Sequence, residues 1–254
     1  GEKLGHRRVS LTRPEAEGHA AMLAFSALGY SGKAATQERI LDYHSEIAVH
    51  ADASMNVVET IRVRAAGNQI QRGIYRDFPT RYKDRFGNRL NVAFEVLDVT
   101  RNGTPEPWFI EGRGNGVRLY IGSRDRFVAP GEHTYAIEYR TNWQLGFFET
   151  HDELWWNVNG NDWGFAIDRA SARVTLPGSA GAENIAIEGW VGDYGSTERS
   201  VLARVEDDAS ANISATRTLA PRESLTFAMA WPKGIVTAPT LSESAERLLF
   251  NNRG

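Results

Sequence analysis

The sequence predicts an all-β protein, an antiparallel β-sandwich of one or two stacked units with a short C-terminal helix. Apolar and polar side chains alternate with a period of two in many short segments, as in strands that place one face on a core. Turn signals such as Asn102-Gly103 and Pro130-Gly131 separate these segments at short intervals. Beyond residue 239 the apolar residues recur at helical spacing instead.

The first 36 residues differ from the rest and contain no strand pattern. Their basic start, apolar run AAMLAFSALG and small-residue exit resemble a secretory signal. Glu15 and Glu17 do not fit a signal, and Thr12 with Glu15 matches the capping box of a short helix. Residues 1–36 are therefore interpreted as a signal-like, tag-derived or flexible segment, with a native helix as the alternative.

Residues 37–150 are expected to form the first β-sandwich unit. One of its strands, MNVVETIRVR, has Val57, Ile61 and Val63 on an apolar face that also includes Glu59. A carboxylate in an apolar row is costly unless it is paired or protonated. We expect a structural ion pair between Glu59 and Arg76, which lies in the next segment.

That next segment, GNQIQRGIYRDFPTRYKDRFGNRL, combines five arginines and one lysine with aromatic residues and glycines. Such a composition is compatible with an anion or nucleic-acid site. Asp77 and Asp84 dilute the charge, however, and Phe86-Gly87-Asn88 is typical of an ordered loop. The structural loop is the interpretation that we favour.

Residues 151–238 are expected to form the second β-sandwich unit, with a boundary near residues 145–152. Thr240 and Glu243 then match a capping box, and Leu241, Ala245, Leu248 and Leu249 follow at helical spacing. Residues 239–254 are therefore predicted to contain a helix.

The segment before Trp163 combines tryptophans with carboxylates and provides the candidate binding residues. Flat aromatic rings beside carboxylates and amides can hold sugars, and a glycosidase needs two carboxylates across the bond that it cleaves. The alternative is that adjacent tryptophans on a strand face opposite ways, so that one packs in the core. The candidates are Trp155, Trp156, Trp163, Glu153 and Asp162.

The composition of the chain limits the kinds of ligand and reaction to be expected. The chain has no cysteine, and its formal net charge of -3, from 29 basic and 32 acidic residues, offers no general field for nucleic acid. His44 and His50 are too far apart along a strand to share one ion, and His151, Asp152 and Glu153 are consecutive, which does not suit a metal site on a strand. No catalytic signature stands out, and we expect no metal and no cofactor.

Several segments, in their order and spacing over residues 37–240, resemble a bacterial family known as domain of unknown function 2207. These segments are ERILDYHSEIAV, VVETIRV, RGIYRDFP, LYIGSRDRFVAPGEHTYAIEY, DELWWNVNGNDW, VTLPG and APRESLTFAMAWPKGIV. The resemblance implies a β-rich extracytoplasmic domain of a membrane protein, preceded by a signal peptide and followed by membrane segments. It supplies no catalytic residues.

On this resemblance we expect a non-catalytic domain, on the periplasmic or extracellular side, of a protein anchored through segments outside this chain. The C-terminal helix would lead toward a membrane segment beyond Gly254. The expected partner is an envelope protein or a glycan, and the expected role is binding or sensing. The competing hypothesis is a carbohydrate-active enzyme or glycan-binding domain that uses the Trp and carboxylate cluster of residues 143–168.

Overall fold

The computed structural model describes residues 37–83 and 88–251. The expectations for residues 1–36 fall outside this part of the chain. The described residues form strands in four sheets, a short 3₁₀ helix η1 (Ala182–Asn184) and a C-terminal helix α1 (Leu241–Asn251). The all-β class and the short C-terminal helix predicted from the sequence are therefore confirmed.

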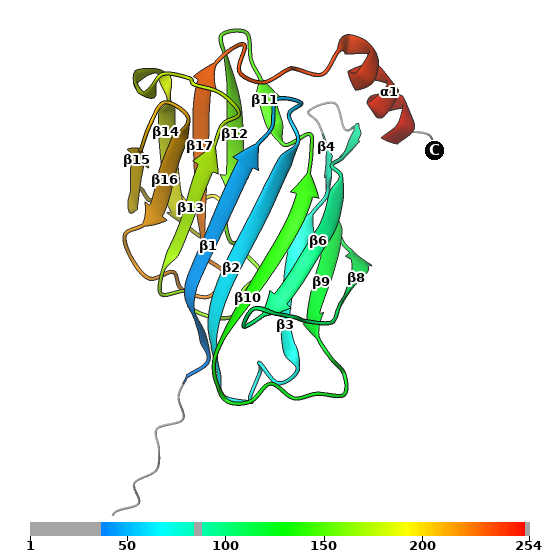
Figure 1. Ribbon diagram of the computed structural model, residues 1–254, viewed down its shortest axis with the longest axis vertical. Helices are drawn as coiled ribbons and strands as arrows, with labels where there is room; N and C mark the ends of the chain where they lie inside the picture. The colour runs from blue at the N-terminus through cyan, green and yellow to red at the C-terminus, as the bar shows by residue number, and fades with distance from the viewer. Residues whose placement is uncertain (1–36, 84–87, 252–254) are drawn as a thin grey trace, which may run out of the picture. The chain divides into compact units, whose positions relative to one another are not determined.

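The largest sheet has eight strands and forms one layer of a sandwich (Figure 1). In spatial order its strands are β15 (Val201–Val205), β16 (Ser210–Ala215), β13 (Ala170–Thr175), β1 (Arg39–Val49), β2 (Met55–Ala65), β10 (Gly131–Thr141), β6 (Phe94–Arg101) and β7 (Thr104–Pro105). Buried and partly exposed residues alternate along the whole of β2, because one face of the strand meets the core.

Smaller sheets form the other layer (Figure 1). The four-stranded sheet contains β11 (Leu145–Phe147), β12 (His151–Asn157), β17 (Ser224–Pro232) and β14 (Ala186–Gly192). The three-stranded sheet contains β3 (Gly73–Pro79), β9 (Gly116–Gly122) and β8 (Trp108–Arg113), and β4 (Arg81–Lys83) pairs with β5 (Arg89–Asn91). Tyr43, Leu119, Tyr139 and Trp231 belong to one hydrophobic core, to which both layers contribute.

One strand pair departs from the antiparallel pattern. β1 and β13 are parallel, with Tyr43 opposite Ala170 and Ala48 opposite Thr175. The alternation of side chains predicts which face of a strand is buried but not which strand lies beside it. Through this pair the eight-stranded sheet combines strands from both sides of the expected boundary at residues 145–152.

The helix α1 begins with the capping box predicted from the sequence. The Glu243 backbone N–H donates to Thr240 Oγ1 (3.2 Å), and the Thr240 N–H donates to Glu243 Oε2 (2.7 Å). Arg247 on this helix donates to the backbone oxygen of Asn91 in β5. The side chains of Leu241, Leu248 and Leu249 lie outside the described part of the chain, whereas Ala245 is exposed.

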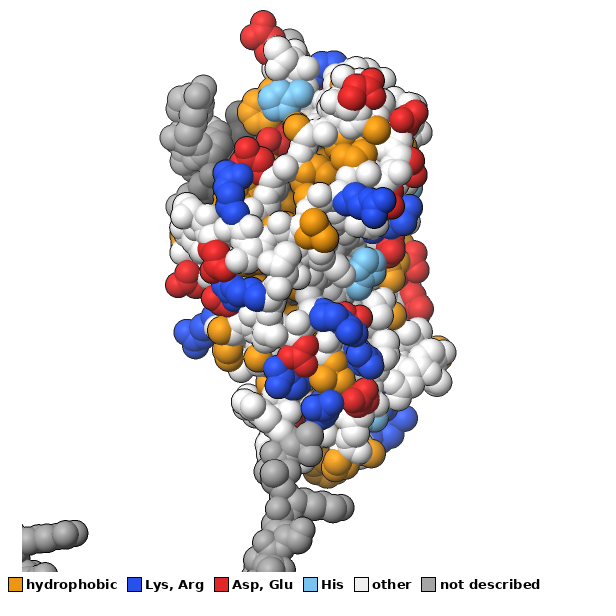
Figure 2. Space-filling view, turned by 90° about the vertical axis from the view of Figure 1, so that its left-hand side faces the viewer, with side chains coloured by type: hydrophobic (Ala, Val, Ile, Leu, Met, Phe, Trp, Pro, Cys, Tyr) orange, Lys and Arg blue, Asp and Glu red, His pale blue; other side chains and the backbone are white. Residues whose placement is uncertain are grey.

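The surface on the β14 and β15 side of the sandwich intermixes Lys and Arg with Asp and Glu (Figure 2). The fields of oppositely charged side chains that are interspersed in this way largely cancel, and salt at about 0.1 M screens what remains beyond about 10 Å. This face therefore presents no field of one sign.

Candidate functional site

A buried ion pair joins the two layers beneath the candidate site. Glu59 on β2 and Arg76 on β3 have 0% and 6% of their surface exposed. Arg76 Nε lies 2.9 Å from Glu59 Oε2, and Arg76 Nη2 lies 3.0 Å from Glu59 Oε1. The structure thus brings together the two residues that the sequence suggested as a pair.

Two tyrosines complete the hydrogen bonding of Glu59. The hydroxyl of Tyr139 donates to Glu59 Oε1 (3.1 Å), and that of Tyr43 donates to Glu59 Oε2. Burial raises the pKa of both tyrosines well above its usual value, so they remain neutral donors. Burial acts to lower the pKa of Arg76, but the charge of Glu59 outweighs it and the pKa is raised overall. The cluster is charged, paired and structural.

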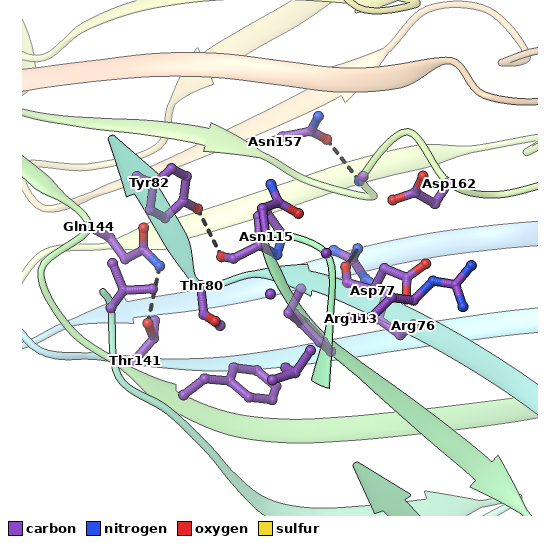
Figure 3. Close-up of a pocket in the computed structure, with 18 of the residues that line it drawn as sticks. Arg76, Asp77, Thr80, Tyr82, Arg113, Asn115, Thr141, Gln144, Asn157 and Asp162 are labelled. Atoms are coloured by element: carbon purple, nitrogen blue, oxygen red, sulfur yellow. Dashed lines mark hydrogen bonds between the residues drawn. The ribbon is translucent and has the colours of Figure 1, made fainter. Parts of the chain in front are cut away.

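Above this pair lies a groove of about 950 Å³, which is the candidate site. Its lining comes from the three-stranded sheet, from β4 and β5, from β6 and β10 of the large sheet, from β12 and the turn that follows it, and from α1. Figure 3 shows Asn115, from the turn between β8 and β9, in the middle of this view, with Tyr82 on one side and Asp162 on the other. The volume is within the range of small-molecule and oligosaccharide sites.

Trp155 and Trp156 both line the groove but differ in burial. Trp155 is 57% exposed and stacks on Trp190, with ring centroids 4.9 Å apart and an interplanar angle of 24°. Trp156 packs against the hydrophobic core, and its buried indole nitrogen has no hydrogen-bond partner among the described residues. Adjacent positions on a strand point to opposite faces, which explains the difference.

Asp162 also lines the groove, whereas Trp163 and Glu153 do not. Trp163 is buried, donates from its indole nitrogen to the backbone oxygen of Asn159 (2.8 Å) and lies edge-on to Tyr43. Glu153 is half-buried on β12. The structure therefore brings Trp155, Trp156 and Asp162 together and separates Trp163 and Glu153 from them.

Reasoning from the sequence missed Asn115 and Arg247, which also line the groove, and included Trp143 only as the start of the cluster of residues 143–168. Asn115 lies in Gly112-Arg113-Gly114-Asn115-Gly116, a stretch that resembles a glycine-rich phosphate loop only superficially and gave no sign of another site. Trp143 has a backbone φ of 58°, a left-handed conformation that bulky residues rarely adopt. No local signal in the sequence connects Arg247 with this site.

The two carboxylates that line the groove differ in whether a partner engages them. Arg118 binds Asp77 through two hydrogen bonds, Nε to Oδ1 at 2.6 Å and Nη2 to Oδ2 at 2.5 Å. Asp162 is exposed, and its carboxylate has no partner among the described residues. Within residues 37–83 and 88–251, no group of three or more His, Asp or Glu side chains is placed to hold a metal ion.

The chain thus forms an all-β domain with an open groove that is lined in part by aromatic side chains. A family model, described as the N-terminal domain of predicted membrane proteins (DUF2207), matches residues 39–231. The chain belongs to this family, whose description associates it with a membrane. None of the helices in the described part of the chain has the length and apolar character that a bilayer crossing requires.

The chain is also similar to a bacterial protein and to parts of solved structures. The chain is 27% identical over 217 residues to the uncharacterized protein YciQ of Escherichia coli K12, a match that covers 84% of this chain and 34% of that protein. It thus spans about a third of the relative's length. Leukotriene A4 hydrolase of Saccharomyces cerevisiae is similar with a TM-score of 0.45 and 12% identity, over 76% of this chain and 29% of that chain. An M1 zinc metallopeptidase of Deinococcus radiodurans is similar with a TM-score of 0.44 and 12% identity, over 84% of this chain and 52% of that chain.

Proposed function

We propose that this chain is the glycan-binding module of a membrane protein, on its extracytoplasmic side, and that it holds its ligand in the aromatic groove without cleaving it. The family description supports the membrane association. The extracytoplasmic side rests on the resemblance found in the sequence. The exposed ring of Trp155 at the groove is the observation that carries the proposal.

Trp155 has the geometry of a platform for a sugar ring. Its stacking on Trp190 fixes the orientation of its indole, and more than half of its surface faces solvent. An aromatic ring held in place in this way loses little further freedom when a ligand covers it. The apolar faces of sugar rings can pack on such a surface while their hydroxyl groups remain at the rim.

Polar groups with free hydrogen-bonding capacity are available for those hydroxyls. The side chain of Asn115 is exposed and has no partner among the described residues, although its backbone oxygen accepts from Thr80 and Arg81. Gln144 donates from Nε2 to Thr141 Oγ1 (3.1 Å), which leaves its Oε1 as an acceptor. A few polar groups in an aromatic site are the usual means of fixing ligand orientation.

The charge arrangement favours binding over hydrolysis. A glycosidase generally needs two carboxyl groups that are free to act on the same bond. Of the two carboxylates that line the groove, Asp77 is engaged by Arg118 in two hydrogen bonds. Asp162 alone supplies a free carboxylate from the described lining, which supports a binding role.

The test is a titration of the 254-residue chain with soluble oligosaccharides from bacterial envelopes and with neutral glucans, followed by calorimetry. Trp155→Ala should weaken binding by about tenfold or more, the equivalent of ~1.4 kcal/mol. Phe127→Ala is the matched control, because Phe127 is 69% exposed and lies outside the groove. Both variants should remain folded, as a urea titration of each would check, because neither side chain is buried in the core.

Equal affinity in the unaltered chain and Trp155→Ala would contradict the proposed site, and no binding to any oligosaccharide would contradict the proposed function. The side of the membrane is tested in the full-length protein through Leu202→Cys, since Leu202 is 61% exposed and this chain has no cysteine of its own. A membrane-impermeant maleimide should label it in intact cells above the background of the unaltered protein. Labelling only after lysis would refute the extracytoplasmic placement.

A further inference from the structure

Arginines outnumber carboxylates in the lining of the groove, and two of them lack a counter-ion among the described residues. Arg76 faces Glu59, and Arg118 faces Asp77. Arg113 and Arg247 also line the groove, but no carboxylate of the described residues lies within ion-pair distance of either. The groove therefore presents positive charge that the described part of the chain does not neutralise.

Arg247 is the more informative of these two cations, because it is partly buried. Its Nε and Nη2 donate to the backbone oxygen of Asn91, at 3.2 and 2.5 Å, and its Cζ lies 4.3 Å from the centre of the Trp143 ring. Burial lowers the pKa of Arg247, whereas nearby carboxylates raise the pKa of Arg76 and Arg118. Partial desolvation without a counter-ion is unfavourable, and an anion would offset it.

The geometry leaves donors of Arg247 free for such an anion. A guanidinium has five N–H groups in a planar fork, and Nη1 of Arg247 has no partner among the described residues. The guanidinium carbon lies over the ring of Trp143, whose backbone is held in a strained left-handed conformation with a φ of 58°. Such strain is typical of functional sites, and here it places a ring under a cation at the groove.

We propose that the ligand of the groove is an acidic glycan, and that Arg247, held on the ring of Trp143, pairs with a carboxylate of that glycan. This inference rests on the proposed function and adds the chemical class of the ligand to it. Arg247 sets the preference for the acidic ligand, and the platform of Trp155 supplies affinity that is independent of charge.

The experiment compares tetragalacturonate with its methyl ester, which has the same sugar rings and no charge. The unaltered 254-residue chain should bind the acid at least about tenfold more tightly than the ester, because a charge-assisted hydrogen bond is stronger than a neutral one. Arg247→Gln should bring the acid-to-ester ratio of affinities close to one. Arg126→Gln removes the same charge outside the groove and should leave the ratio unchanged.

The acid-to-ester ratio of affinities remains decisive even if Arg247→Gln detaches α1 from β5. A structural loss alone weakens the binding of both ligands equally and leaves the ratio unchanged. An unchanged ratio would therefore overturn the role of Arg247. Trp155→Ala should weaken acid and ester by the same factor. Equal binding of acid and ester by the unaltered chain overturns the inference and leaves the proposed function standing. Binding of neither tetrasaccharide, nor of neutral cellotetraose and chitotetraose, overturns the proposed function itself.

A further binding experiment identifies the anionic group of the ligand. A tetrasaccharide with a terminal phosphate should bind no more tightly than tetragalacturonate if the groove selects a carboxylate. Tenfold tighter binding of the phosphorylated sugar would assign the anion as phosphate and overturn the carboxylate assignment.

Discussion

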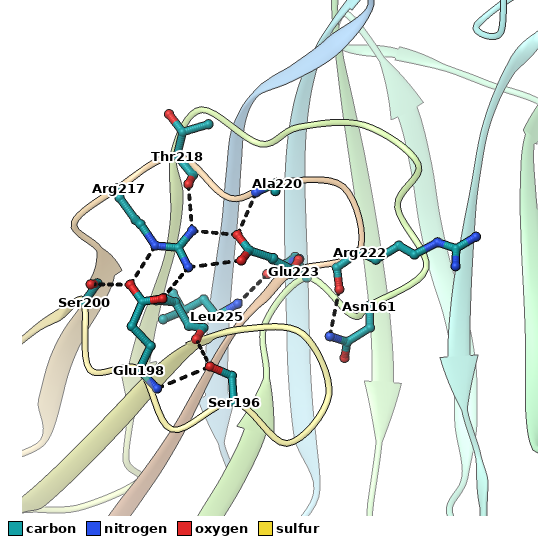
Figure 4. Close-up of polar contacts among 12 residues, drawn as sticks. Asn161, Ser196, Glu198, Ser200, Arg217, Thr218, Ala220, Arg222, Glu223 and Leu225 are labelled. Carbon is teal, nitrogen blue, oxygen red and sulfur yellow. Dashed lines mark hydrogen bonds and ion pairs between the residues drawn. The ribbon is translucent and has the colours of Figure 1, made fainter. Parts of the chain in front are cut away.

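Two arginine clusters in this protein have similar hydrogen bonds and opposite surroundings. Arg76 lies in the interior and pairs with the single carboxylate of Glu59. Arg217 lies near the surface and pairs with two, Glu198 at 2.7 Å and Glu223 at 2.6 Å (Figure 4). The Arg217 cluster joins the segment before β15 to the segment before β17, much as Arg76 joins β3 to β2.

The comparison teaches that surroundings, more than the number of bonds, set the energetic effect of an ion pair. Water can solvate Arg217 and its partners once their bonds are broken, so an exposed pair contributes little. Glu59 has no such alternative, because its surface is entirely covered. Removal of its partner leaves a charge that water cannot reach and that the hydroxyls of Tyr43 and Tyr139 compensate only in part.

The largest effect is expected from breaking the buried pair. Arg76→Met should lower the free energy of unfolding by about 3–5 kcal/mol, because it leaves Glu59 buried and unpaired. Replacing both partners, as Glu59→Met with Arg76→Met, should restore much of that loss, since an apolar pair creates no unsatisfied charge. Urea unfolding measures both. A cost below about 1 kcal/mol for Arg76→Met would show that the pair does not hold the layers together.

An intermediate effect is expected from removing one donor to Glu59. Tyr139→Phe deletes the hydroxyl that lies 3.1 Å from Glu59 Oε1, and should cost about 1.5–3 kcal/mol. Tyr135→Phe is the matched control on the same strand, because the buried hydroxyl of Tyr135 has no partner among the described residues. Its removal should be neutral or stabilising in the same urea titration. Equal costs for the two variants would rule out a specific contribution from the Tyr139 hydroxyl.

The smallest effect is expected at the surface cluster, and it should depend on pH and salt. A hydrogen bond from Arg217, with a smaller contribution from that of Ser200, lowers the pKa of Glu198 from 4.5 to about 2. A carboxylate with a lowered folded-state pKa stabilises the fold above its unfolded pKa and loses that effect as the pH falls through the folded one. The difference in melting temperature between the unaltered chain and Arg217→Gln should thus reach its largest value above about pH 4.5 and vanish toward pH 2. It should also shrink in 1 M salt, and a difference independent of both would contradict this account.

The two clusters also differ in how far the sequence reveals them. Glu59 attracts notice because it is a carboxylate in an apolar row, and the nearby arginine-rich segment supplies its partner. Glu198, Arg217 and Glu223 lie in polar segments, where charges are common and alternation gives no signal. A conflict between local pattern and chemistry can be detected in a sequence, whereas a favourable surface contact cannot.

The same contrast applies to the fold and the groove. Side-chain alternation predicted the all-β class and many of the strands, and the capping box predicted α1. The interpretation of residues 67–90 as a loop was wrong, because this segment contains β3, β4 and the start of β5. Trp155, Trp156 and Asp162 were accessible as candidates because they are close together in the sequence. Arg247 meets Asn91 across a separation of 156 residues, and periodicity within single strands holds no information on such contacts.

The parallel pairing of β1 with β13 has a consequence for how the chain is synthesised. His44 and Ser171, side by side in this pair, are 127 residues apart in sequence. While the ribosome is still adding those residues, β1 can form a hairpin with β2 but exposes a row of backbone donors and acceptors on its other side. Nascent chains that stall before residue 170 would therefore be prone to aggregate at this edge, and the large sheet cannot be completed until β13, β15 and β16 have been synthesised.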